Sequence, residues 1–112
     1  LILVPRVENI REIFELNAAQ QQQLLQESSW VSERMARHFN ATKINIGTLG
    51  NMVPQLHLHH IARYENDAAW PAPVWGKHPA EPYSIDNLQR MNERLHEAFA
   101  DAGDIHFKWA DR

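Results

Sequence analysis

The spacing of apolar residues along the first third of the chain changes from that of a strand to that of a helix. Residues 1–4 form a continuous apolar run that Pro5 ends, which predicts a buried strand. Apolar residues then recur close to helical spacing over residues 7–16 and predict a short helix. Asn17, with Gln20 three residues later, matches a capping box, which predicts a longer helix running to about His38.

The middle of the chain has strand-like patterns and then a proline-rich segment. Residues 43–46 and 56–64 predict two strands, and residues 47–51, which contain two glycines, predict a tight loop after the first of them. Residues 65–83 contain four prolines and three large aromatic residues, which predicts an extended loop ordered by packing. For residues 70–76 of this loop we consider two interpretations, a segment packed over the sheet and a lid or dimer contact at a site.

The last third of the chain predicts one helix and a short tail. Ser84 is a good N-cap for a helix whose apolar stripe reaches Ala102, and Gly103 suits the position that follows a helix. The alternating Ile105, Phe107 and Trp109 then predict a short strand or a tail docked on an apolar surface.

Together these elements predict an α+β fold, an antiparallel sheet with helices packed against it. The length of 112 residues fits a single domain over residues 1–112. The chain opens on an apolar strand and shows only three clear strands. We therefore expect N-terminal strands to be missing upstream of Leu1.

Composition narrows the classes of function. Lysine and arginine number 11 against 14 acidic residues, and the net charge of −3 disfavours binding to a nucleic acid polymer, although not to a small anion. The chain has no cysteine, which excludes disulfides and Cys-based metal sites. The longest apolar run is too short for a membrane span or a signal segment, so we expect a cytoplasmic protein without a membrane partner.

The candidate chemistry lies where three of the seven histidines fall within four residues. On a strand, alternation places Gln55, His57 and His59 on one face, with His60 on the other beside two leucines. A Gly-Asn loop just before them offers main-chain N–H groups to an anion. Paired imidazoles beside such a loop suit a phosphate, because one imidazole attacks phosphorus while neighbouring donors hold the oxygens. We interpret His60 as a partly buried histidine with a hydrogen-bond partner.

Residues 50–59, Gly-Asn-Met-Val-Pro-Gln-Leu-His-Leu-His, resemble the signature of the histidine triad (HIT) superfamily, which is His-φ-His-φ-His-φ-φ with φ apolar. The resemblance covers most of the chain from Leu1 to about Trp75. It implies a nucleotide-binding hydrolase or nucleotidyl transferase that works at the α-phosphate through a covalent nucleotidyl-His intermediate. It also implies a symmetric homodimer that needs no metal and no cofactor.

By position, the resemblance implies that His57 is the nucleophile. It also implies that His59 helps to bind the phosphate and acts on the leaving group. Gly50, Asn51 and Asn45 would contact the phosphate. The sequence departs from the family pattern because Gln55 stands where the first triad histidine is expected. A glutamine forms hydrogen bonds but takes no proton, so it would hold the neighbouring imidazole or main chain.

Two alternatives stay open at this stage. The first is a nucleotide-binding HIT-fold dimer without turnover, for which Gln55 is the best support. The second is a metal-binding module that uses the His-x-His spacing with a third ligand such as Glu65 or His78.

Overall fold

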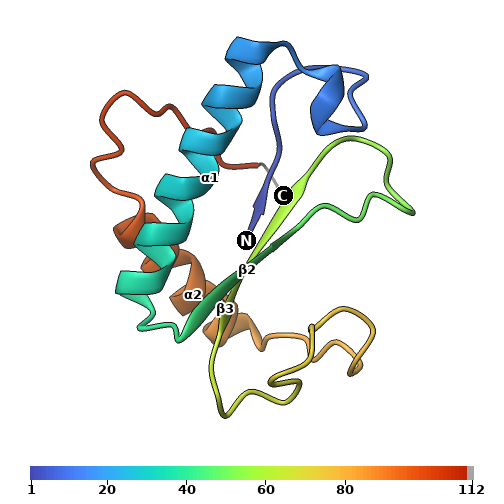
Figure 1. The fold of residues 1–112 in the computed structure, drawn as a ribbon. Helices are drawn as coiled ribbons and strands as arrows, with labels where there is room; N and C mark the ends of the chain where they lie inside the picture. Colours follow the sequence, from blue (N-terminus) through green and yellow to red (C-terminus); the bar gives the residue numbers. More distant parts are fainter. Residues whose placement is uncertain (111–112) are drawn as a thin grey trace. The chain divides into compact units, whose positions relative to one another are not determined.

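A computed structural model describes residues 1–110 of the chain (Figure 1). Its elements in order are β1 (Ile2–Leu3), the 3₁₀ turn η1 (Ile13–Glu15), α1 (Ala18–His38), β2 (Lys43–Gly47), β3 (Leu58–Arg63) and α2 (Ile85–Ala98). They form two compact units, Leu1–Pro79 and the part from Ala80 onward. We describe each unit by itself, and the expectation of a single domain over residues 1–112 stays a prediction.

The first unit is built on a three-stranded antiparallel sheet with β3 in the centre, in the order β1-β3-β2. In the register of β2 and β3, Ile46 lies opposite His60 and Gly47 lies opposite His59. Residues opposite each other on antiparallel strands share a face, so the sheet separates His60 from His59. The α+β fold predicted from the sequence is confirmed.

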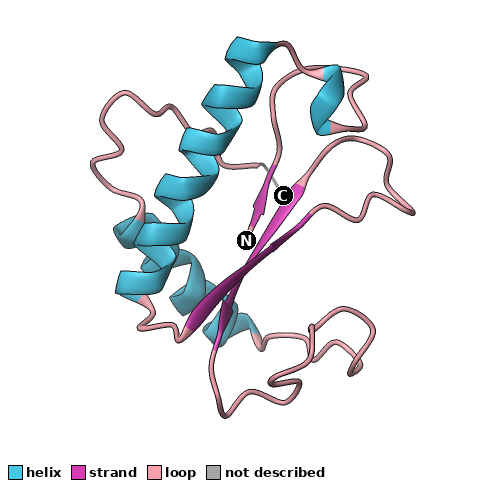
Figure 2. Cartoon of the chain, in the orientation of Figure 1, coloured by secondary structure: helices cyan, strands magenta, loops and turns pink. Residues whose placement is uncertain are grey.

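Helix α1 covers one face of this sheet (Figure 2). It begins as predicted, because Asn17 Oδ1 accepts a hydrogen bond from the Gln20 main-chain N–H at 2.8 Å and Gln20 Oε1 accepts from the Asn17 N–H at 3.0 Å. Its buried residues follow at helical spacing, namely Leu24, Ser28, Val31 and Met35. Leu16 and Leu24 form a core cluster with Leu56 and Leu58, the two leucines on either side of His57. Burial of this apolar stripe ties α1 to the sheet.

The predicted helix over residues 7–16 is wrong, since only the turn Ile13–Glu15 forms there. The carbonyls that such a helix would need are used elsewhere. The main-chain N–H of Leu56 donates to the Ile10 carbonyl at 2.7 Å, and the Gln55 side chain donates to the Val7 carbonyl at 3.2 Å. Val7 and Ile10 instead pack on the core cluster from an irregular segment.

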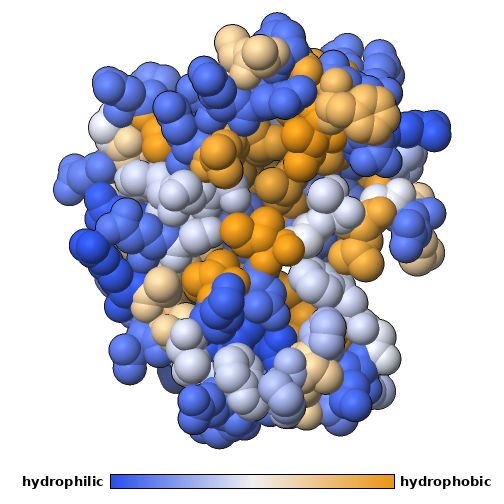
Figure 3. Space-filling view, viewed as in Figure 1, coloured by the Kyte–Doolittle hydropathy of each residue, from blue (hydrophilic) through white to orange (hydrophobic). Residues whose placement is uncertain are grey.

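The outer strands of the sheet keep exposed apolar residues. Ile2 on β1 is 54% exposed and Ile46 on β2 is 50% exposed. Figure 3 shows apolar surface in the middle of the face viewed, with polar residues around it. Such exposed apolar side chains at strand edges are typical of surfaces that meet another chain.

The second unit contains α2 and the tail. Ser84 Oγ accepts from the Asn87 main-chain N–H at 3.2 Å, as predicted, but the helix ends at Ala98, before Gly103. The tail forms no strand over its described residues. Its Trp109 ring lies 4.2 Å from that of His96 and 5.8 Å from that of Phe99 between ring centres, so the tail docks on α2. Within residues 1–110, every helix is too short or too polar to cross a membrane.

Candidate active site

His57 lies directly before β3, and the main chain fixes which of its ring nitrogens carries the hydrogen. His57 Nδ1 is 2.7 Å from the main-chain carbonyl oxygen of Gln55. A carbonyl oxygen only accepts, so Nδ1 carries the hydrogen and donates it. Nε2 of the neutral ring then keeps an unshared electron pair, and within residues 1–110 it has no hydrogen-bond partner. This half-buried ring therefore presents a nucleophilic nitrogen.

His59 accompanies His57 on the same side of the strand. The two rings are 5.2 Å apart between centres and inclined at 62°. Burial lowers the pKa of His59 below its ordinary value, and the charge of His57 acts in the same direction. His59 is therefore neutral at pH 7, where it can accept or pass on a proton. The structure brings these two predicted residues together.

Gln55 acts on His57 through its main chain. Its side-chain Nε2 donates to the carbonyl of Val7 and does not contact the imidazole, which bonds to the Gln55 carbonyl. The side chain thus ties the loop of residues 48–57 to the N-terminal segment. A carbonyl exists at this position whatever the side chain, so the glutamine does not prevent correct orientation of His57.

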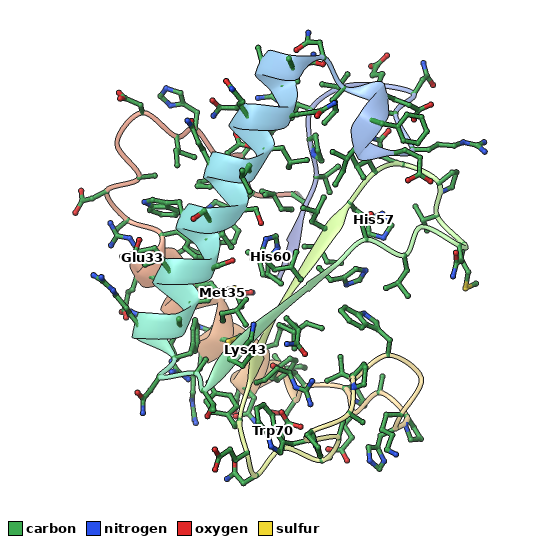
Figure 4. All side chains as sticks on the ribbon, in the orientation of Figure 1. Glu33, Met35, Lys43, His57, His60 and Trp70 are labelled. Atoms are coloured by element: carbon green, nitrogen blue, oxygen red, sulfur yellow. The ribbon has the colours of Figure 1, made fainter. Side chains whose placement is uncertain are left out.

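His60 also bonds through Nδ1 to a main-chain carbonyl, but this ring has a structural role. Its Nδ1 is 3.2 Å from the Leu58 carbonyl, and its Nε2 is 2.8 Å from Oγ of Ser28 on α1. The first contact places the hydrogen on Nδ1, so Nε2 accepts from the serine hydroxyl. Figure 4 shows His60 between the sheet and α1. Its ring is completely buried, which lowers its pKa. The predicted hydrogen-bond partner of His60 is confirmed, but the ring is completely buried and not partly buried as predicted, and its Nε2 is not available to a substrate.

The predicted phosphate contacts lie on two elements. Gly50 has a φ of +63°, a left-handed conformation that favours glycine, and it shapes the loop in which Asn51 is exposed. Asn45 lies on β2 on the same sheet face as His59. Its Oδ1 accepts from Arg63 Nη1 at 2.7 Å, so its amide NH₂ remains as a donor for an anion. Phosphate contacts by Asn45, Gly50 and Asn51 stay predictions.

Sequence reasoning missed the role of Arg63. The sequence patterns do not single out this residue, yet the Arg63 side chain is only 2% exposed. Its Nε and Nη2 donate to the two carboxylate oxygens of Asp67 at 2.8 and 3.0 Å, and Nη2 also reaches the Ala72 carbonyl at 2.8 Å. The alternation that puts His57 and His59 on one face also puts Arg63 there, and this was the available signal.

Residues 67–75, here called the tryptophan strap, pack on the face of the sheet that carries His59. Trp70 lies over the Arg63 guanidinium at 5.6 Å from the ring centre, and the Trp75 ring lies 6.1 Å from the His59 ring. The interpretation of this loop as a segment packed over the sheet is confirmed. A lid or dimer contact stays a prediction.

Comparison with known proteins shows to which family this chain belongs. The model of the HIT domain matches residues 1–66. The chain belongs to the histidine triad (HIT) family. A histidine triad protein from Marinobacter aquaeolei VT8 is 56% identical with a TM-score of 0.82, and the match covers 87% of this chain and 71% of that one. A HIT protein from Sinorhizobium meliloti 1021 is 44% identical with a TM-score of 0.81, covering 87% of this chain and 72% of that one.

A third histidine triad protein, from Bradyrhizobium japonicum, is 42% identical with a TM-score of 0.81, again covering 87% of this chain and 72% of that one. A search of curated proteins found no match. The comparisons thus show the HIT family and its fold.

The Arg63–Asp67 pair predicts a pH-dependent contribution to stability. The Arg63 guanidinium, together with main-chain N–H groups of the strap, holds the pKa of the Asp67 carboxyl well below its usual range. The ionised Asp67 therefore stabilises the folded state fully at pH values above the unfolded pKa of about 3.9. This stabilisation is lost as the pH falls toward the lowered pKa of the folded state. We expect the difference in unfolding free energy between wild type and Asp67→Asn to shrink between pH 7 and pH 3.

Urea denaturation at both pH values measures this difference. Asp104→Asn, which changes an exposed carboxylate of the tail, is the matched control and should change stability little at either pH. An Asp67→Asn difference that stays constant over this range would contradict a paired, ionised Asp67.

Proposed function

We propose that this HIT-family chain binds a nucleotide conjugate and cleaves it at the α-phosphate through a covalent nucleotidyl-His57 intermediate. The observation that carries the proposal is the 2.7 Å hydrogen bond from His57 Nδ1 to the Gln55 carbonyl. It leaves Nε2 with its electron pair in a half-buried position beside a second imidazole. A neutral imidazole in this state is a good nucleophile near pH 7 and a good leaving group afterwards.

In the first step, the electron pair of Nε2 attacks the α-phosphorus and a P–N bond forms. The bond from phosphorus to the leaving group breaks, and its electron pair departs with the leaving group, which takes up a proton relayed from the solvent by His59. His57 then carries a positive charge, which the Gln55 carbonyl stabilises by accepting the Nδ1 hydrogen. In the second step, water attacks phosphorus and the P–N bond breaks. The neutral imidazole returns, and the proton that the water loses passes through His59 to the solvent. Another acceptor in place of water makes the reaction a transfer.

His59 is the group that supports proton exchange in both steps. Its ring lies 5.2 Å from that of His57, and burial keeps it neutral at pH 7. We assign it the relay of these protons and contact with the phosphate. The Asn45 amide and the main chain of Gly50 and Asn51 are the neutral donors that we assign to the phosphate oxygens.

The alternatives differ in support. Among residues 1–110, no group of three histidine, cysteine, aspartate or glutamate side chains could hold a metal ion, so we do not carry the metal module forward. We rank second the binding dimer without turnover, which rested on Gln55, because the side chain of this residue does not contact His57 and its carbonyl still orients the ring. We retain the homodimer as part of the proposal because Ile2 and Ile46 leave apolar surface at the sheet edges.

A turnover assay with adenosine 5′-phosphoramidate and no added metal tests the nucleophile. His57→Ala removes the attacking nitrogen, so we expect AMP release to fall at least about 1,000-fold. Intact-mass measurement of wild type after a rapid acid-free quench should show the added mass of one nucleotidyl group, absent from the variant.

His106→Ala, which removes an exposed histidine of the second unit, is the matched control and should keep wild-type turnover. Nucleotide binding by wild type without turnover or adduct would contradict the enzyme and favour the binding module. Turnover that survives in His57→Ala would contradict the assigned nucleophile.

Gln55→Ala separates the main chain of this residue from its side chain. The carbonyl that orients His57 is retained, and only the side-chain hydrogen bond to Val7 is lost, a net effect of about 1 kcal/mol. We therefore expect turnover to fall by less than about tenfold, measured in the same assay. A loss as large as that of His57→Ala would mean that the glutamine side chain itself takes part in the chemistry.

A further inference from the structure

The tryptophan strap is held at its beginning by the buried Arg63. Asp67 accepts two hydrogen bonds from the guanidinium and others from the main-chain N–H groups of Tyr64, Ala69 and Trp70. Arg63 also reaches past Asp67 to the Ala72 carbonyl. These contacts fix the path of the strap over the sheet up to three residues before Trp75.

At the other end of the strap, the Trp75 indole is packed tightly against β2. A Cβ atom added at Gly47 would lie 2.7 Å from Cη2 and 3.0 Å from Cζ2 of Trp75, closer than a real side chain permits. Gly47 is the residue that pairs with His59 across the strands. The indole thus lies beside this pair, with its ring centre 6.1 Å from that of His59 and the two rings nearly perpendicular at 81°.

We propose that Trp75 is a positioning residue for His59, because its indole holds the imidazole against β2 and keeps water from one side of it. The functional consequence rests on the proposed function, in which His59 exchanges a proton with the leaving group. Arg63 and Asp67 act one step further away, since they hold the strap that carries the indole. No feature of the HIT signature itself includes Trp75, which lies beyond the matched residues 1–66.

The electrostatic surroundings of His59 agree with this role. The groups that act on its charge are His57 on its own side of the sheet and the amine of Leu1, and both oppose protonation. The paired positions on β1 and β2, Ile2 and Gly47, carry no charge. Burial is the largest cause of the lowered pKa of His59, and Trp75 supplies part of that burial.

Two variants change the indole in different ways. Trp75→Ala removes it, and Gly47→Ala displaces it by adding the excluded methyl group to β2. Both should raise the pKa of His59 toward its ordinary value, followed by NMR titration of its Hε1 signal in the full chain. Trp30→Ala, which removes a tryptophan of α1, is the matched control and should leave the pKa of His59 unchanged.

A double-variant cycle links the two changes. Gly47→Ala acts only by clashing with the indole, so it should have little further effect once Trp75 is alanine. Full additivity of the two pKa shifts would overturn the proposed contact. Should Trp75→Ala fail to fold, Gly47→Ala and Trp75→Leu still test whether His59 responds, because each keeps a large side chain in the strap.

Activity gives the second readout. We expect kcat/KM of Trp75→Ala to fall roughly 10- to 100-fold from misplacement of His59. In the pH dependence of kcat/KM, the limb that reports the titration of His59 should move to higher pH. A structural role alone would lower stability and leave both the His59 titration and that limb in place, which would overturn the proposal. If wild type shows no turnover, the proposed function fails, and the NMR titration still decides the role of Trp75.

Discussion

The chemistry proposed for this HIT-family chain depends on one short hydrogen bond, from Nδ1 of His57 to the main-chain carbonyl of Gln55. This bond fixes the tautomer and thereby determines which ring nitrogen keeps an unshared electron pair. In the proposed reaction it also stabilises the positive charge that develops on the ring. Because the acceptor belongs to the main chain, the tautomer of His57 does not depend on the residue type at position 55. A glutamine there is compatible with the proposed nucleophile.

Alternation along β3 separates two histidines that are adjacent in sequence. His59 lies on the face that carries the tryptophan strap, while His60 lies on the face covered by α1. There, the hydroxyl of Ser28 forms a hydrogen bond with Nε2 of His60. Both His57 and His60 bond through Nδ1 to the carbonyl two residues earlier. What differs is the state of Nε2, buried and bonded in His60 and without a partner among the described residues in His57. Burial therefore distinguishes the structural histidine from the candidate catalytic one.

Much of the first unit could be predicted because its signals are local. The capping box of Asn17 and Gln20 gave the start of α1, and the period of two along residues 56–64 gave the faces of β3. The helix over residues 7–16 failed because Leu56 and Gln55, distant in sequence, take the carbonyls it needed. The buried Arg63 escaped prediction for the same reason, since its partners are on a neighbouring strand and in the strap. The place of Trp75 over Gly47 likewise depends on strand register.

The most direct test of the proposed nucleophile is the tautomer of His57, read from two-bond ¹H–¹⁵N correlations of the ring in the neutral form. We expect a protonated Nδ1 and an unprotonated Nε2 for His57. The same state is expected for His60, which makes the same contact in a buried position and serves as an internal reference. A His57 ring with its hydrogen on Nε2 would contradict the proposal, because the nitrogen proposed to attack phosphorus would then have no electron pair to give.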